Sequence, residues 1–151
     1  MKLWAKVLII TPLAGLPAAA IGHLIWPPTQ EITPTPGQMP FLIFLNGAEA
    51  LTFGLGVAFL VVAWPWVKRA APRARRLTTL TYLATAWSLL NWLPHDDLHI
   101  HNGLNVQGVL YIDYGFHLTI IGAAALVAYF VYWTLRAAAG GTAAPEVGAD
   151  L

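Results

Sequence analysis

Of the chain's 151 residues, 58% are hydrophobic and 10% are charged, whereas soluble domains are about 45–50% apolar and about 25% charged, so an ordinary soluble domain and a disordered chain are excluded. The chain has no cysteine, which excludes disulfides, thiolate zinc sites, cysteine-ligated iron–sulfur clusters and cysteine nucleophiles. A formal net charge of +1 gives no reason to expect nucleic acid, and what remains is an integral membrane protein in contact with the lipid bilayer.

Four apolar segments are long enough to cross a membrane as helices, which takes about 20 residues for about 30 Å of hydrocarbon. They cover residues 3–26, 41–64, 77–93 and 116–135. Their apolar runs are continuous rather than alternating, so they are not barrel strands. The sequence therefore predicts an all-α, integral membrane four-helix bundle of up-down topology. It forms one domain over residues 1–138, followed by a disordered tail, 139–151, that is rich in alanine and glycine.

The first segment, residues 3–26, shares features with a secretory signal, namely a basic start and the small-residue run at 18–20. Its apolar character continues to Trp26, however, which gives it enough length to span a bilayer. We therefore expect an uncleaved helix, kinked at Pro12 and Pro17 as membrane helices tolerate.

The basic residues all fall on one side of these predicted spans. They are Lys2, Lys6, Lys68, Arg69, Arg73, Arg75, Arg76 and Arg136. Because positive residues in short loops stay in the cytoplasm, both termini are expected to be cytoplasmic. The loops 27–40 and 94–115 are then extracytoplasmic, and the protein is a multi-pass protein of the cell membrane.

The second segment carries an acidic residue, Glu49, within its apolar stretch. Insertion of a carboxylate there costs about 2.5–3.5 kcal/mol, which favours a role as ligand or general base. Asn46, on the same face, is predicted to support it. The alternative is a protonated Glu49 that locks helix packing. On the opposite face, the small residues Ala50, Gly54 and Ala58 predict the close approach of another helix.

The third segment has a polar stripe with helical spacing. It comprises Thr81, Thr85, Ser88, Asn91 and His95. The threonines are expected to hydrogen-bond between helices. Asn91 and His95, which are nearest to the other polar groups, are candidates for function.

A histidine-rich motif follows this stripe. Pro94 and the two aspartates after it predict the start of a short helix at the outer interface, and Asn102-Gly103 predicts its end after about two turns. His95 and His99 are then separated by one helical turn, the spacing at which two imidazoles can share a metal ion.

Asp96 occupies the place of the glutamate in the zinc-protease pattern His-Glu-x-x-His, which makes it a candidate general base. Its side chain is one methylene shorter and the expected helix is short, so we do not predict a metalloprotease. His101 is expected to point away from His99 on a helix and is kept as a supporting residue. The alternative is a loop whose histidines are merely solvated.

The start of the fourth segment carries His117, with Asp113 one turn earlier if the helix begins before Asp113. The carboxylate is then a supporting residue that fixes the imidazole tautomer. His117 also lies at a depth similar to that of His23 in the first segment. The two could therefore serve as axial ligands of a haem iron.

These residues together predict a divalent transition-metal site, of zinc, copper or iron, on the outer face. His95, His99 and His117 are its candidate ligands, and Glu49 or Asp96 is the candidate general base toward a lipid-like small molecule. Two alternatives stay open. One is a haem-binding redox membrane protein. The other is a non-catalytic accessory subunit that docks to a membrane-protein partner or to another copy of itself.

Overall fold

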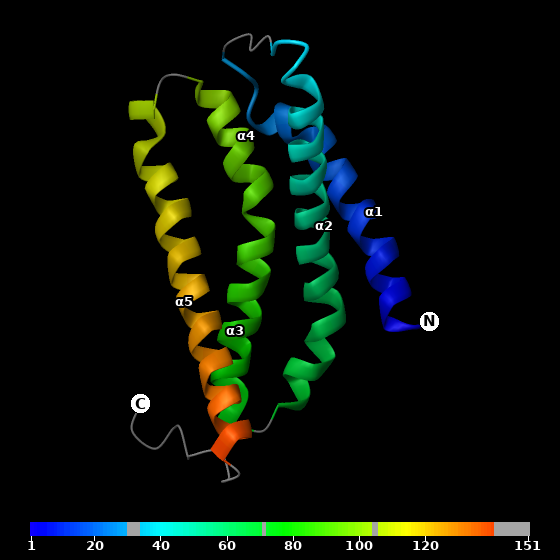
Figure 1. Ribbon diagram of the computed structural model, residues 1–151, viewed down its shortest axis with the longest axis vertical. Coiled ribbons are helices and arrows are strands. Elements are labelled where there is room, and N and C mark those ends of the chain that lie inside the picture. The colour runs from blue at the N-terminus through cyan, green and yellow to red at the C-terminus, as the bar shows by residue number, and fades with distance from the viewer. Residues whose placement is uncertain (30–33, 71, 104–105, 141–151) are drawn as a thin grey trace.

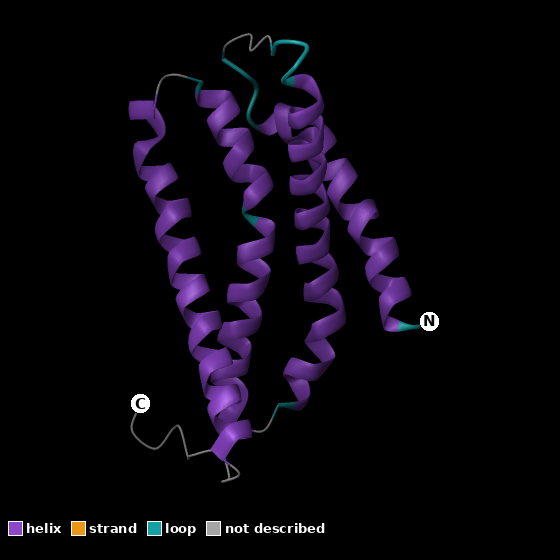
Figure 2. Cartoon of the chain, in the orientation of Figure 1, coloured by secondary structure: helices purple, strands orange, loops and turns teal. Residues whose placement is uncertain are grey.

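The computed structural model describes residues 1–29, 34–70, 72–103 and 106–140. These residues form five α-helices and one short 3₁₀ turn: α1 (Leu3–Ile25), α2 (Met39–Arg69), α3 (Pro72–Leu90), α4 (Trp92–Asn102), η1 (Val106–Val109) and α5 (Leu110–Gly140). Figure 2 shows helices and no strand in the described part of the chain, so the all-α prediction is confirmed. Residues 141–151 of the predicted tail lie outside the described residues.

The helices pack in a row, with α1 against α2, α2 against α3 and α3 against α5. Figure 1 shows that successive long helices run in opposite directions, in the predicted up-down order. α1 and α5 lie at opposite ends of this row, so the four-helix bundle that the sequence predicts is not confirmed.

Three helices, α1, α2 and α5, are long and apolar enough to cross a membrane. They contain the first, second and fourth predicted spans, and α2 extends beyond both ends of the predicted 41–64. The third predicted span, 77–93, corresponds to α3 and the start of α4. α3 does not reach the same apolar character because its 19 residues include three arginines in the first two turns.

Helix α4 continues α3 end to end, with a break at Asn91 that appears as a teal segment in Figure 2. Pro94 explains the break, because its ring has no N–H and clashes with the carbonyl group four residues earlier. That carbonyl belongs to Leu90, the last residue of α3. Helical hydrogen bonding resumes at once, since the His95 N–H donates to the Asn91 oxygen at 3.0 Å.

The predicted outer loop 94–115 contains the expected short helix, but more of it is helical than the sequence predicts. α4 covers 11 residues, starts at Trp92 and extends α3 rather than forming a separate short helix at the interface. Gly103 ends it as predicted, with a positive φ of 55°. α5 starts at Leu110, earlier than the predicted residue 116. Some polar residues of this region, namely His95, His99 and Asp113, contact one another between α4 and α5 and therefore do not mark a solvated loop.

Helices α1 and α2 touch backbone to backbone at a pair of glycines. A Cβ added to Gly15 would overlap the carbonyl oxygen of Ala50, and one added to Gly54 would overlap that of Thr11. Ala50 and Ala58, on the same small-residue face of α2, are also buried. The prediction that this face admits another helix is confirmed, and the helix that it admits is α1.

Candidate metal centre

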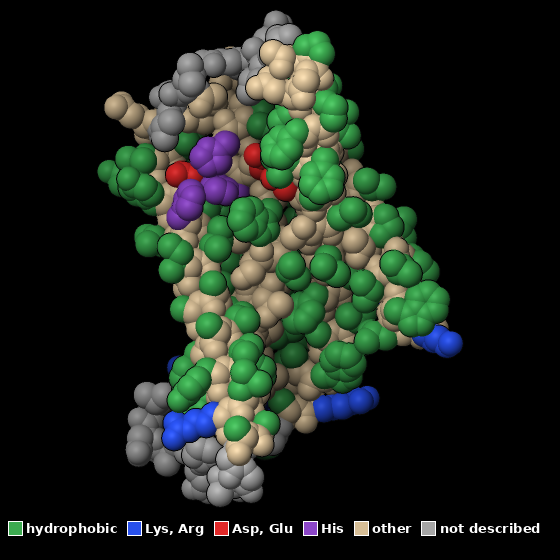
Figure 3. Space-filling view, viewed as in Figure 1, with side chains coloured by type: hydrophobic (Ala, Val, Ile, Leu, Met, Phe, Trp, Pro, Cys, Tyr) green, Lys and Arg blue, Asp and Glu red, His purple; other side chains and the backbone are tan. Residues whose placement is uncertain are grey.

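The charged residues are sorted along the long axis of the molecule. Figure 3 shows histidine side chains grouped near one end with acidic side chains on either side of them, and lysine and arginine side chains at the other end. The start of α1 and the end of α5 lie toward the basic end in Figure 1. The basic residues that the sequence predicts on one side of the membrane are therefore also separated in space from the histidine and acidic residues.

The centre of the histidine group is Asp113, in the first turn of α5. The Nε2 atom of His95, on α4, lies 3.0 Å from the Oδ1 atom of Asp113, and each of these side chains is only 12% exposed. The contact joins two helices that are separated by a turn. The sequence placed Asp113 beside His117 but gave no signal that it faces α4.

His99 reaches the same carboxylate oxygen from the next turn of α4. Its Nε2 atom lies 3.0 Å from Asp113 Oδ1 and 3.1 Å from His95 Nε2. The predicted one-turn spacing therefore does bring the two imidazoles together. His99 is 49% exposed, so the group opens to the surface on this side.

His117 approaches the other oxygen of the carboxylate. Its Nδ1 atom lies 3.6 Å from Asp113 Oδ2 and 2.8 Å from the backbone carbonyl oxygen of Asp113, to which it donates. Because α5 begins before Asp113, the two residues are one turn apart, as the sequence reading required. One ligand atom from each of His95, Asp113 and His117 can be chosen so that all three lie within 4.8 Å of one another, which is close enough to hold a metal ion.

Aromatic rings cover one side of the group. The ring of Phe116 lies 5.1 Å from that of His95, and the Trp87 ring stacks on Phe116 at 6.0 Å. The indole Nε1–H of Trp87 donates to Thr119 Oγ1 at 3.0 Å, which fixes the ring. His95 is thus held between apolar rings on one side and polar partners on the other.

The candidate bases Glu49 and Asp96 belong to a second cluster. Together with Asp97 they form what we call the acidic cluster. The Glu49 carboxyl on α2 faces both aspartates on α4, and its Oε2 atom is buried without a hydrogen-bond partner. Asp97 lies beside Asp96 and near His23 of α1. A Cβ on Gly22 would overlap the Asp97 carboxylate, so α1 also closes on this cluster.

His23 therefore lies by Asp97, whereas His117 lies by Asp113. The structure places the two proposed haem ligands in different groups, and it does not bring Glu49 or Asp96 into the histidine group. Within the described residues, the side chains of His95, Asp113 and His117 are close enough to hold a metal ion together, and His99 contacts this group through Asp113 Oδ1.

The remaining supporting residues have other contacts. The Asn46 amide donates to the Leu42 carbonyl of its own helix at 3.0 Å. His101 points away from His99, as predicted: its ring contacts the Pro27 carbonyl oxygen, and its own carbonyl accepts from Thr29 Oγ1 at 2.6 Å. His101 thus ties the segment after α1 to the end of α4.

Asn91 is fully buried at the break between α3 and α4. Neither its Oδ1 nor its Nδ2 atom has a hydrogen-bond partner. A supporting role for its amide at the site stays a prediction.

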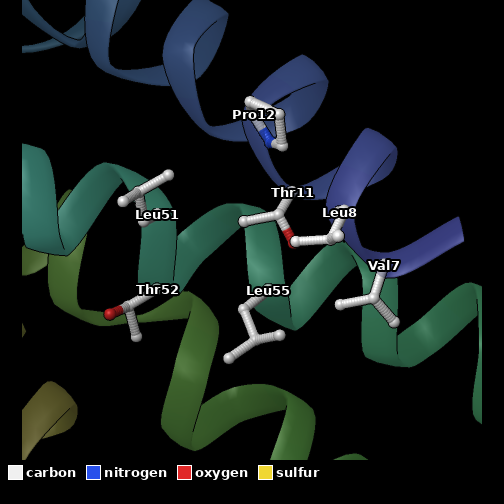
Figure 4. Close-up of a pocket in the computed structure, with 7 residues that line it drawn as sticks. All are labelled: Val7, Leu8, Thr11, Pro12, Leu51, Thr52 and Leu55. Carbon is white, nitrogen blue, oxygen red and sulfur yellow. The ribbon is translucent and has the colours of Figure 1, made fainter. Parts of the chain in front are cut away.

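A groove of about 490 Å³ lies between α1 and α2 (Figure 4). Its walls are mainly apolar, with Val7, Leu8 and Pro12 on one side and Leu51 and Leu55 on the other. The lining includes no histidine and no acidic residue, so we assign the groove no part in the candidate metal centre.

No protein-family model matches the chain, and neither the curated proteins nor the solved structures give a match. Function is therefore inferred from the geometry and chemistry of the histidine group.

Proposed function

We propose that this chain is a multi-span membrane protein that binds a divalent transition-metal ion at His95, Asp113 and His117, with His99 beside them. The observation that carries the proposal is the convergence of three imidazoles on one carboxylate across two helices. Neutral imidazole and carboxylate are ligands of zinc, copper and iron. A bound cation would also take the lone pairs of His95 Nε2 and His99 Nε2, which face Asp113 Oδ1 and each other.

We also propose that α3 and α4 together form a fourth crossing. Their 19 and 11 residues reach about 45 Å at about 1.5 Å per residue, which exceeds the hydrocarbon thickness of about 30 Å. The basic end would then face the cytoplasm, and the metal would lie at the extracytoplasmic edge of the bilayer. A lipid-like molecule could reach it from the outer leaflet.

The test is metal analysis of the detergent-purified protein, combined with a visible absorption spectrum. We expect about one equivalent of transition metal in the wild type and loss of most of it in His95→Ala and Asp113→Ala. The matched control is His23→Ala, an exposed histidine outside the group, which should retain the metal. Helical content and elution volume should be unchanged in all variants.

Two results would contradict the proposal. One is a metal-free wild type from cells grown with iron, zinc and copper. The other is equal metal in the wild type and in His95→Ala. A Soret absorption band that is lost in both His23→Ala and His117→Ala would favour the haem alternative instead.

A further inference from the structure

The basic end of the molecule carries a group of cations that the candidate metal centre does not use. α2 ends at Arg69 and α3 begins at Pro72, so the two helix ends are adjacent. Exposed cations lie on both sides of this turn, and we define the basic patch as Lys68, Arg69, Arg75 and Arg76. Because like charges that lie close together repel one another, the patch favours an anionic partner.

The packing of α2 on α3 fixes the backbone positions that carry the patch. Ala63 and Val67 of α2 form a buried cluster with Tyr82 of α3, and none of the three is more than 8% exposed. The Tyr82 hydroxyl donates to the Leu60 carbonyl oxygen at 2.7 Å, which ties the two helices together. The cations at the end of α2 and those at the start of α3 therefore share one rigid support.

The length of α2 places the patch in the headgroup layer of a bilayer. Its 31 residues reach about 46 Å at about 1.5 Å per residue. The hydrocarbon of a bilayer is about 30 Å thick, and the headgroup regions bring the total to about 40–45 Å. A crossing by α2 therefore carries Lys68 and Arg69 beyond the hydrocarbon, to the level of the lipid phosphates.

Aromatic rings accompany the cations at this end. The Nζ atom of Lys68 lies 5.2 Å from the centre of the Trp64 ring, and Trp66 is 56% exposed. On α5, the Cζ atom of Arg136 lies 5.8 Å from the centre of the Trp133 ring. Tryptophan is enriched at membrane–water interfaces, where its ring lies at the level of the headgroups. The rings thus indicate the same depth as the length of α2.

We propose that the basic patch binds the headgroup of an anionic phospholipid, in the leaflet that the proposed orientation makes cytoplasmic. Clusters of roughly four to eight lysines and arginines next to a spanning helix are typical of sites for anionic lipids. The guanidinium groups of Arg75 and Arg76 can each bind a phosphate through two parallel hydrogen bonds. The proposal does not depend on metal binding, because the histidine group lies at the opposite end of the molecule (Figure 3).

The test is native mass spectrometry of the full-length protein in detergent with added lipid. The probes are phosphatidylglycerol, which is anionic, and phosphatidylcholine with the same acyl chains, which has no net charge. We expect the wild type to retain phosphatidylglycerol preferentially. Each lysine or arginine near an anionic lipid surface contributes about fivefold in affinity, so the double variant Arg75→Gln, Arg76→Gln should bind about 25-fold more weakly.

The matched control is the double variant Lys2→Gln, Lys6→Gln, which removes the same charge at the start of α1. Figure 1 shows this start well apart from the turn between α2 and α3. The control should bind phosphatidylglycerol as the wild type does, and both double variants should keep the helical content of the wild type. Equal weakening in the two double variants, or equal retention of the two lipids by the wild type, overturns the proposal.

Two further measurements separate charge from fold and lipid from free phosphate. Arg75→Lys with Arg76→Lys keeps both charges and should retain most of the binding, so a loss as large as that of the glutamine variant contradicts an electrostatic site. Inorganic phosphate at the concentration of the lipid should not displace phosphatidylglycerol. Full displacement would overturn the assignment to a lipid and indicate a site for free phosphate.

Discussion

At the scale of single residues, the Asn91 side chain is expected to lower the stability of the fold, and a substitution can test this. Its amide is fully buried and has no hydrogen-bond partner, a state that costs about 1–3 kcal/mol. Asn91→Leu keeps the number of side-chain heavy atoms and has no polar atom, so we expect it to raise the thermal unfolding temperature in detergent. Circular dichroism during heating measures this change.

The contrasting variant is Tyr82→Phe, which removes a satisfied bond from the buried Tyr82 hydroxyl to the Leu60 carbonyl at 2.7 Å. It should lower stability by about 0.5–1.5 kcal/mol. If Asn91→Leu lowers stability as well, the Asn91 amide has a partner in the folded protein and its predicted supporting role gains weight.

The sequence allowed part of the site to be predicted at this scale. The one-turn spacing of His95 and His99 was readable because both lie on the same helix. The approach of Asp113 to them was not, because spacing along a chain does not specify which side chains meet across helices. The pairing of Glu49 with Asp96 escaped prediction for the same reason, although each was singled out separately.

At the scale of elements, the break at Pro94 is expected to position the metal ligands. Pro94→Ala restores an N–H that can bond to the Leu90 carbonyl, so α3 and α4 should merge into one straighter helix. His95 and His99 would then turn away from Asp113, and metal affinity should fall while thermal stability holds or rises. Metal titration and thermal unfolding measure the two effects separately.

Pro65→Ala is the matched control, since Pro65 lies within α2 near the basic end, far along the helix from the histidine group. It should leave metal affinity unchanged. Unaltered affinity in Pro94→Ala would show that the break does not set the geometry of the site.

The contact between α1 and α2 gives a second prediction at this scale. Gly54→Ala places a methyl group against the backbone of Thr11, and such overpacking costs about 1–3 kcal/mol. We expect a lower unfolding temperature. Gly122→Ala on α5, where an added Cβ meets nothing within 4 Å, should be neutral or slightly stabilising because alanine favours helix. Equal effects of the two variants would contradict the close contact.

Element boundaries were less predictable than element type. The small-residue face of α2 indicated a close helix contact, and the glycine pair with α1 supplies it. The continuity of α3 and α4 was missed because Pro94 and the two aspartates after it were interpreted as the start of a separate helix. Contacts with α5 and α2 partly bury several of the polar residues after Pro94, and only the three-dimensional arrangement shows this.

At the scale of the whole molecule, the sorting of charge makes orientation testable. Lysine and arginine lie at one end and the histidine group at the other (Figure 3). If the positive end is cytoplasmic, the metal centre faces the outside of the cell. The chain has no cysteine, so single cysteines can be introduced and labelled without background.

Two exposed positions suit this labelling. Gly37 lies between α1 and α2 with nothing within 4 Å of an added Cβ, and Ala74 lies in the first turn of α3 beside the arginines. In intact cells, a membrane-impermeant maleimide should label Gly37→Cys and should label Ala74→Cys only after the membrane is opened. Neither substitution removes a charge, so the basic signal for orientation is retained.

The reverse pattern would place the histidine group in the cytoplasm. Labelling of both positions in intact cells would mean that α2 does not cross the membrane, because Gly37 and Ala74 lie on either side of that helix. Both results would contradict the proposed orientation, but they differ in consequence. The first keeps the crossings and moves the metal centre to the cytoplasmic face, whereas the second removes a crossing on which the approach of a lipid-like molecule from the outer leaflet depends.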